Sequence, residues 1–181
     1  MGTCGSPPSV LENPKEKPSP PSVLENSKEK PLITFRNDML NEHNLKRKIH
    51  GASDLILNEE LNNKAQDYAK QILLSKGKWA FPTNIYNDSV LGENILISSK
   101  KTPNEIIEKW YKERDYFNFS LNKYQKNTGH FTQLVWKSTK EVGFGLESDS
   151  DNNYCCVALY YPGGNIIGEF SDNVVDSIID K

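Results

Sequence analysis

Residues 128–139 read TGHFTQLVWKST, and they place His130, one of the three histidines of the chain, between a glycine and a run of apolar residues. The pattern predicts a short helix with Thr128 as its N-terminal cap, because a threonine hydroxyl can accept a backbone N–H of the first turn. The apolar residues after the histidine are suited to a core. His130 itself fits three roles, a metal ligand, a catalytic base or a packing residue, and the choice depends on its partners.

Helices are predicted on the N-terminal side of this stretch. Apolar residues recur at helical spacing in residues 33–51 and 58–77, and both segments end at a glycine. Residues 102–105, TPNE, have the pattern of a capping box and open a third helix that runs past Trp110. Residues 78–96 are rich in Pro, Asn and Asp, and we expect them to be mostly loop.

Strands are predicted on the C-terminal side. The segments EVGFGLE (141–147) and NYCCVALYYPGGN (153–165) are rich in β-formers, and the turn cluster SDSDN separates them. This order of elements predicts an α+β fold in which an antiparallel sheet packs between helical layers.

Composition limits the classes of protein to which the chain can belong. Its 181 residues, 36% of them hydrophobic, allow one sizeable domain and a tail. The formal charge of -2 provides no broad positive field, so we expect no nucleic-acid partner. No apolar run reaches the roughly 20 residues that cross a bilayer, and no secretory signal opens the chain, so we expect a cytosolic protein. Cys155 and Cys156 would face opposite sides of a strand, and we expect both to be reduced and buried.

A duplication occupies most of the first 32 residues. Residues 7–18 and 20–31 read PPSVLENPKEKP and PPSVLENSKEKP, without an aromatic residue. Such a segment buries too little apolar surface to offset its ordering entropy. We therefore expect a disordered tail over residues 1–32 and a folded domain over residues 33–181.

The first six residues, MGTCGS, fit the pattern for N-myristoylation of Gly2. Cys4 stands beside it, where a membrane-delivered protein can be palmitoylated. A single myristoyl chain binds a membrane only weakly, so two acyl chains would be needed for a stable anchor. The two residues predict a lipid-anchored protein on the cytosolic face of a membrane.

Four motifs follow one another in an order that resembles a known family: LGEN (91–94), WYKE (110–113), GHFTQLVW (129–136) and YYPGGN (160–165). Together they resemble the CAP superfamily of cysteine-rich secretory, antigen 5 and plant pathogenesis-related proteins. The resemblance implies a three-layer α-β-α sandwich with a central antiparallel sheet, the CAP or SCP domain. The scarce cysteines and the acylation-type start resemble most the Golgi-associated plant-pathogenesis-related branch. That branch implies association with membrane lipids, protein partners or a second copy of the chain, without an established reaction.

Members of this family commonly line a cleft with two histidines and two glutamates that can bind zinc. The resemblance matches Glu93, Glu113 and His130 to three of these positions. The second histidine should lie in KWAFPTN, where the matching residue is Ala80, or Trp79 or Phe81 in a shifted alignment. None of these three side chains ligates a metal, so we expect a depleted cleft that holds no cofactor and binds zinc weakly at best.

Three classes of function remain after these observations. The favoured class is a non-enzymatic, membrane-peripheral protein, at the Golgi by resemblance, whose basic run Lys46, Arg47 and Lys48 touches anionic headgroups. The second is a soluble or unconventionally secreted interaction protein, in the extracellular region and without lipid contact. The third is a hydrolase with His130 as general base and a serine nucleophile such as Ser138, but no serine lies in a nucleophile motif.

Overall fold

The computed structural model describes residues 1, 23–75, 85–99 and 102–179. The helices are α1 (Val23–Ile49), α2 (Glu59–Leu74), α3 (Pro103–Tyr111), α4 (Gly129–Leu134) and α5 (Phe170–Asn173), with the 3₁₀ segments η1 (Lys112–Tyr116) and η2 (Phe119–Leu121). The strands are β1 (Ile56–Leu57), β2 (Ile85–Tyr86), β3 (Ser89–Val90), β4 (Gly92–Ser98), β5 (Glu141–Ser148) and β6 (Tyr154–Tyr161). Among the described helices, none is long and apolar enough to cross a membrane.

The main sheet has the strand order β1-β5-β6-β4. The predicted hairpin is confirmed, since β5 and β6 pair antiparallel from Glu141 opposite Tyr161 to Ser148 opposite Tyr154. Strand β4 pairs antiparallel with the other side of β6. The short β1 pairs parallel with β5, so the sheet is mixed at this one edge, where the sequence predicted antiparallel pairing throughout.

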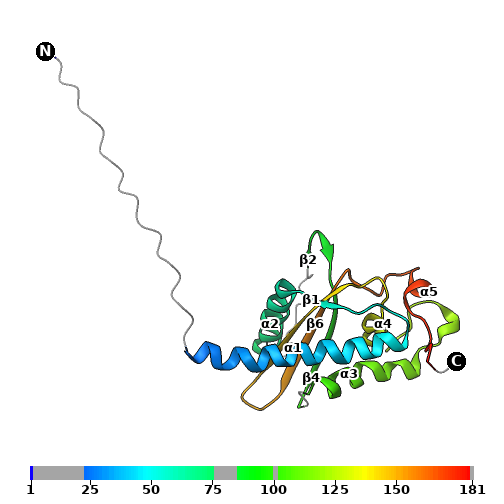
Figure 1. Ribbon diagram of the computed structural model, residues 1–181, viewed down its shortest axis with the longest axis horizontal. Coiled ribbons are helices and arrows are strands. Elements are labelled where there is room, and N and C mark those ends of the chain that lie inside the picture. Colours follow the sequence, from blue (N-terminus) through cyan, green and yellow to red (C-terminus); the bar gives the residue numbers. More distant parts are fainter. Residues whose placement is uncertain (2–22, 76–84, 100–101, 180–181) are drawn as a thin grey trace.

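Helices cover both faces of the sheet (Figure 1), which confirms the α-β-α sandwich. The alternation of β6 shows how the layers divide the core. On one face Cys155, Val157 and Leu159 pack against α2, and on the other Cys156, Ala158 and Tyr160 join the larger cluster formed with α1, α3 and α4. Both cysteines are therefore buried and free, on opposite faces, as predicted.

Two glycines of β5 let α2 lie directly on the sheet. A Cβ atom on Gly143 would come within 2.2 Å of the backbone of Leu61, and one on Gly145 within 2.3 Å of the backbone of Ala65. Neither approach leaves room for a side chain. The two glycines of EVGFGLE thus allow the backbone of α2 to lie directly against β5.

Helix α1 begins earlier than the sequence predicted. It starts at Val23, inside the second copy of the duplication, and continues through Pro31. A proline inside a helix removes one backbone hydrogen bond. Leu32 and Phe35 pack on the core cluster, and together with Pro31 they line a cleft against α2 and β5. This packing offsets the loss, so the helix extends beyond the expected boundary at residue 33, and its first turns project past the sheet in Figure 1.

The segment expected to be mostly loop contains three strands. Ile85 pairs with Val90 across a tight turn in which Asn87 and Asp88 have φ of 47° and 57°. Asn and Asp tolerate this left-handed conformation, so the residues that suggested a loop instead make a hairpin turn. Strand β4 follows at once, and it carries the GEN residues into the sheet.

The predicted third helix is confirmed, but its cap differs from the expected capping box. Thr102 occupies the N-cap position and Pro103 opens the helix, yet the threonine side chain accepts no backbone N–H. Its hydroxyl instead donates to the carboxylate of Glu105 at 2.7 Å. The threonine hydroxyl is thus engaged by a side chain of the first turn and not by its backbone.

Candidate functional site

The site around His130 begins with one carboxylate, that of Glu113 in η1. His130 Nδ1 lies 2.6 Å from Glu113 Oε1, and the backbone N–H of His130 donates to Oε2 at 2.8 Å. The backbone N–H of Phe131 also points at Oε2, at 3.3 Å. Glu113 therefore caps the N-terminus of α4, where unpaired N–H groups and the helix dipole favour a negative charge.

The predicted cap, Thr128, does not fill this role. It stands at the N-cap position, but its hydroxyl donates to the carbonyl of Gln125 at 2.7 Å. The N–H groups of the first turn are already taken by Glu113, which comes from a different element. Sequence spacing alone cannot show a cap that lies 17 residues away.

The ring of Trp110 lies parallel to the ring of His130. The rings of Trp110 and His130 stack with centroids 6.3 Å apart and an interplanar angle of 11°. Trp110 is buried, whereas the His130 side chain is 40% exposed and that of Glu113 is 21% exposed. The pair thus lies at the rim of the core, open to solvent on one side.

A chain of buried hydrogen bonds connects His43, Tyr160 and Asn94. The chemistry of the groups fixes which of them donates and which accepts. His43 Nδ1 lies 2.9 Å from the carbonyl of Met39, which can only accept, so Nδ1 carries the proton. Burial lowers the pKa of His43 to about 3, which leaves the ring neutral and its Nε2 an acceptor. The hydroxyl of Tyr160, 2.8 Å away, must then donate to Nε2.

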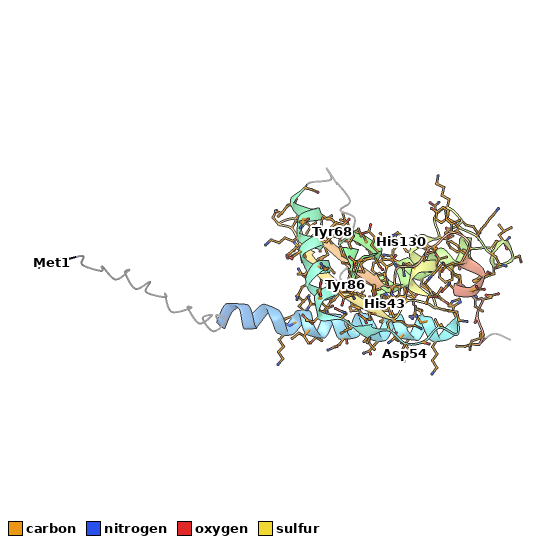
Figure 2. The ribbon with its side chains drawn as sticks, turned by 90° about the horizontal axis from the view of Figure 1, so that it is seen from above. Met1, His43, Asp54, Tyr68, Tyr86 and His130 are labelled. Carbon is orange, nitrogen blue, oxygen red and sulfur yellow. The ribbon has the colours of Figure 1, made fainter. Side chains whose placement is uncertain are left out.

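The same chain reaches His130 through Asn94 of β4. The amide nitrogen of Asn94 donates to the Tyr160 hydroxyl at 3.1 Å and to the backbone carbonyl of His130 at 3.0 Å. All three linking side chains, those of His43, Tyr160 and Asn94, are buried. This network joins α1, β6, β4 and α4, and it fixes the start of α4 from inside. Figure 2 labels His43 and His130 on their helices.

Glu93 does not belong to the same group of contacts. Asn94 turns toward α4, so its neighbour Glu93 faces the other side of the sheet. There it lies near Tyr68 of α2, whose pKa is raised to about 12 by burial and, next, by the charge of Glu93. The structure thus brings Glu113 and His130 together, and it places Glu93 by Tyr68.

The described residues do not fit a zinc ion. Within the ranges that the structure describes, no three His, Cys, Asp or Glu side chains form a group able to hold a metal. Both oxygens of Glu113 already accept hydrogen bonds from the start of α4. Ala80, and the shifted choices Trp79 and Phe81, fall outside the described residues, as do the acylation positions Gly2 and Cys4.

The other two histidines have structural partners. His50 Nδ1 lies 2.6 Å from the carbonyl of Val175, and Nε2 lies 2.9 Å from the hydroxyl of Tyr111. Burial lowers the pKa of His50. With His43 held by Met39 and Tyr160, neither histidine is available to the site at His130.

The basic run on α1 is not the headgroup contact that the sequence suggested. Arg47 is fully buried, and its guanidinium donates to four backbone carbonyls: those of Ser53, Leu134, Trp136 and Thr139. Lys46 forms an ion pair with Glu108 and lies 4.6 Å from the centre of the Tyr111 ring. Only Lys48 of the three is exposed.

The serine named for a hydrolase is also engaged elsewhere. The hydroxyl of Ser138 donates to the side-chain oxygen of Asn173 at 2.6 Å. No hydrogen bond between a serine side chain and His130 occurs among the described residues. The arrangement lacks the nucleophile and base contact that this chemistry requires.

Two sequence motifs interlock beside the site. Asn165 of YYPGGN donates to the carbonyl of Gly129 and accepts the hydroxyl of Thr132, at 3.0 and 2.6 Å. The N–H of Gly164 donates to the side-chain oxygen of Gln133 at 2.7 Å. The loop after β6 therefore also holds α4, through Gly129, Thr132 and Gln133.

Comparison with known proteins agrees with this arrangement. The model of the cysteine-rich secretory protein family, CAP, matches residues 40–161. Golgi-associated plant pathogenesis-related protein 1 of Homo sapiens is 36% identical over 144 residues, which cover 78% of this chain and 92% of the human protein. Protein PRY2 of Saccharomyces cerevisiae is 34% identical over 78% of this chain and 41% of the yeast protein.

A solved structure agrees as well. The structure of Schistosoma mansoni venom allergen-like protein 4 matches with a TM-score of 0.60 and 25% sequence identity, over 79% of this chain and 94% of that chain. The fold, the order of the motifs and these similarities lead to one conclusion: the chain belongs to the cysteine-rich secretory protein (CAP) family.

Proposed function

We propose that this chain is a non-enzymatic CAP-domain protein, held at the cytosolic face of a membrane by acylation of Gly2 and Cys4, where it binds lipids or protein partners. The observation that carries the proposal is the use of Glu113 as the cap of α4. Both oxygens of this carboxylate are used to hold the start of α4 and the ring of His130. This use supports a structural role for Glu113.

Two observations support the membrane part. The first six residues fit the myristoylation pattern, and a cysteine follows two positions after the glycine. The human relative, 36% identical, is a Golgi-associated protein by name.

Flotation with liposomes tests the anchor. The full chain, made in cells that supply both acyl chains, should float with vesicles that contain anionic lipid. Gly2→Ala should abolish flotation, and Cys4→Ser should reduce it, because one myristoyl chain gives only marginal binding. Thr3→Ala is the matched control, since the pattern accepts any residue there.

Labelling with an alkyne myristate completes this test. We expect a signal in the wild type and in the control, and none in the Gly2→Ala chain. Flotation that persists without the label would assign membrane binding to the folded domain and refute the anchor. Failure of every variant to float would favour a soluble interaction protein instead.

A further inference from the structure

The outer edge of β4 is a site where another strand can add. β4 pairs with β6 on one side, and no strand of the described residues pairs with its other side. Every second residue of such an edge directs its N–H and C=O away from the sheet. The alternate residues of β4 (Gly92–Ser98) that face this edge thus offer backbone partners to an extended chain.

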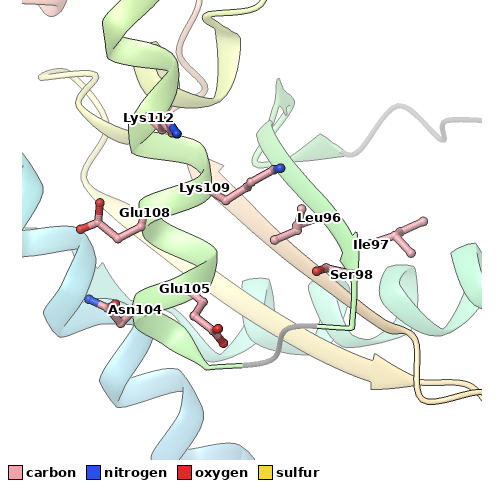
Figure 3. Close-up of a pocket in the computed structure, with 8 residues that line it drawn as sticks. All are labelled: Leu96, Ile97, Ser98, Asn104, Glu105, Glu108, Lys109 and Lys112. Carbon is pink, nitrogen blue, oxygen red and sulfur yellow. The ribbon is translucent and has the colours of Figure 1, made fainter.

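A groove runs beside this edge, between β4 and α3. It encloses about 370 Å³ and is lined on the strand by Leu96 and Ile97 and on the helix by residues that include Lys109 and Lys112. In Figure 3 Leu96 faces the helix, and the Lys109 side chain extends from α3 toward β4. A strand edge next to a helix gives an added peptide both backbone hydrogen bonds and a place for its side chains.

The charges in the groove do not cancel. The two acidic residues of α3 have partners, since Glu108 forms an ion pair with Lys46 and Glu105 accepts the hydroxyl of Thr102. Lys109 and Lys112 are exposed and make no ion pair within the described part of the chain. The neutral hydroxyl leaves the charge of Glu105 in place, so Lys109 and Lys112 exceed the remaining carboxylate of the groove by one positive charge.

We propose that this β4–α3 groove binds an extended segment of a partner protein, which adds to the edge of β4 and sets acidic side chains against Lys109 and Lys112. Apolar residues of the segment, alternating with the acidic ones, would lie on the opposite face of the sheet, beside Ile97. The site is separate from the cleft at His130 and independent of the acyl anchor.

Three synthetic peptides test the proposal on the full, unacylated chain. The first is an acetylated heptapeptide of alternating valine and glutamate, the second carries lysine for glutamate, and the third is the glutamate peptide with alternate backbone nitrogens methylated. We follow the backbone amide signals of β4 by NMR during titration. The glutamate peptide should shift these signals saturably, the methylated one should not, and the lysine peptide should bind about three- to tenfold more weakly, as for two exposed ion pairs.

Charge reversal gives the matched variant. Lys109→Glu with Lys112→Glu, both exposed and therefore compatible with folding, should invert the preference between the glutamate and lysine peptides. Lys48→Glu, an exposed lysine on α1, should leave the preference unchanged. Three results would overturn the proposal: no saturable shift in β4, equal binding of the methylated peptide, or β4 shifts that depend on protein concentration alone, which would make a second copy the occupant.

Discussion

Glu113 contacts His130 at two points, the imidazole ring and the backbone N–H. The carboxylate lies 2.6 Å from the ring nitrogen with one oxygen and accepts the N–H of the same residue at 2.8 Å with the other. Through these two contacts one carboxylate holds both the ring of His130 and the first turn of α4, so the pair secures a helix start.

The ring of His130 should contribute less to the stability of the fold than the carboxylate of Glu113. His130→Ala removes the ring contact and the stacking on Trp110 but leaves both backbone N–H groups on Glu113. We expect a loss of about 0.5–1.5 kcal/mol in the free energy of unfolding, measured by urea denaturation. Asp115→Asn, at an exposed position in η1, should change it by less than about 0.5 kcal/mol. A His130→Ala loss no greater than that of the control would show that the ring is not part of the scaffold.

Arg47 should be required for the stability of the fold, and lysine should not replace it. Its guanidinium donates to four backbone carbonyls, three of them in buried hydrogen bonds, and a lysine ammonium cannot reach them in the same fork. Arg47→Lys should therefore lower the free energy of unfolding by about 2–4 kcal/mol, because acceptors are left unsatisfied. Thermal denaturation with Lys48→Ala as the neighbouring exposed control checks this, and equal melting temperatures would contradict it.

Acid should destabilise the protein partly through His43. Burial lowers the pKa of His43 from 6.5 to about 3, so the unfolded chain binds the proton more tightly than the folded one. Stability is therefore full above pH 6.5 and falls as the pH drops through the window toward 3, by at most about 1.4 kcal/mol per pH unit for this residue. Burial of His50 acts with the same sign.

The variant that isolates this contribution is His43→Gln. Its free energy of unfolding, measured by urea at several pH values inside that window, should show a shallower slope than the wild type. His50 stays in both proteins, so some slope should remain. Parallel slopes for the two proteins would mean that His43 is not the group that takes up the proton.

The two cysteines of β6 should be unreactive until the fold opens. Burial raises the pKa of Cys155 to about 12 and raises that of Cys156 further. A thiol kept protonated and covered does not attack a disulfide reagent. In a Cys4→Ser chain, Ellman's reagent should therefore release no colour under native conditions and two equivalents in denaturant. Rapid native reaction would show that β6 is exposed.

Much of the scaffold could be predicted because its signals are local. The periodicity of α2, the hairpin of β5 and β6 and the opposite faces of the cysteines follow from spacing alone, and the structure has all of them. The resemblance placed Glu93, Glu113 and His130 in one cleft, and the structure shows a contact between Glu113 and His130.

What could not be predicted depends on distant partners. Residues 78–96 were expected to be mostly loop, but Asn94 is buried in a strand, where Tyr160 and the carbonyl of His130 accept from its amide. Arg47 was expected to touch lipid headgroups, but three of the carbonyls that receive it come from residues 134–139. The first turns of α1 read as part of a disordered repeat, but the structure has them in a helix whose Leu32 packs on the core cluster.

The most direct test is the stability of Glu113→Ala, measured by urea unfolding in EDTA and again with zinc. If Glu113 is the cap of α4, the variant should lose about 1–2 kcal/mol in EDTA, more than His130→Ala loses, and zinc should change neither protein. If instead the wild type and the variant are equally stable in EDTA, and zinc stabilises only the wild type, the site is a metal centre and the structural role proposed for Glu113 is wrong.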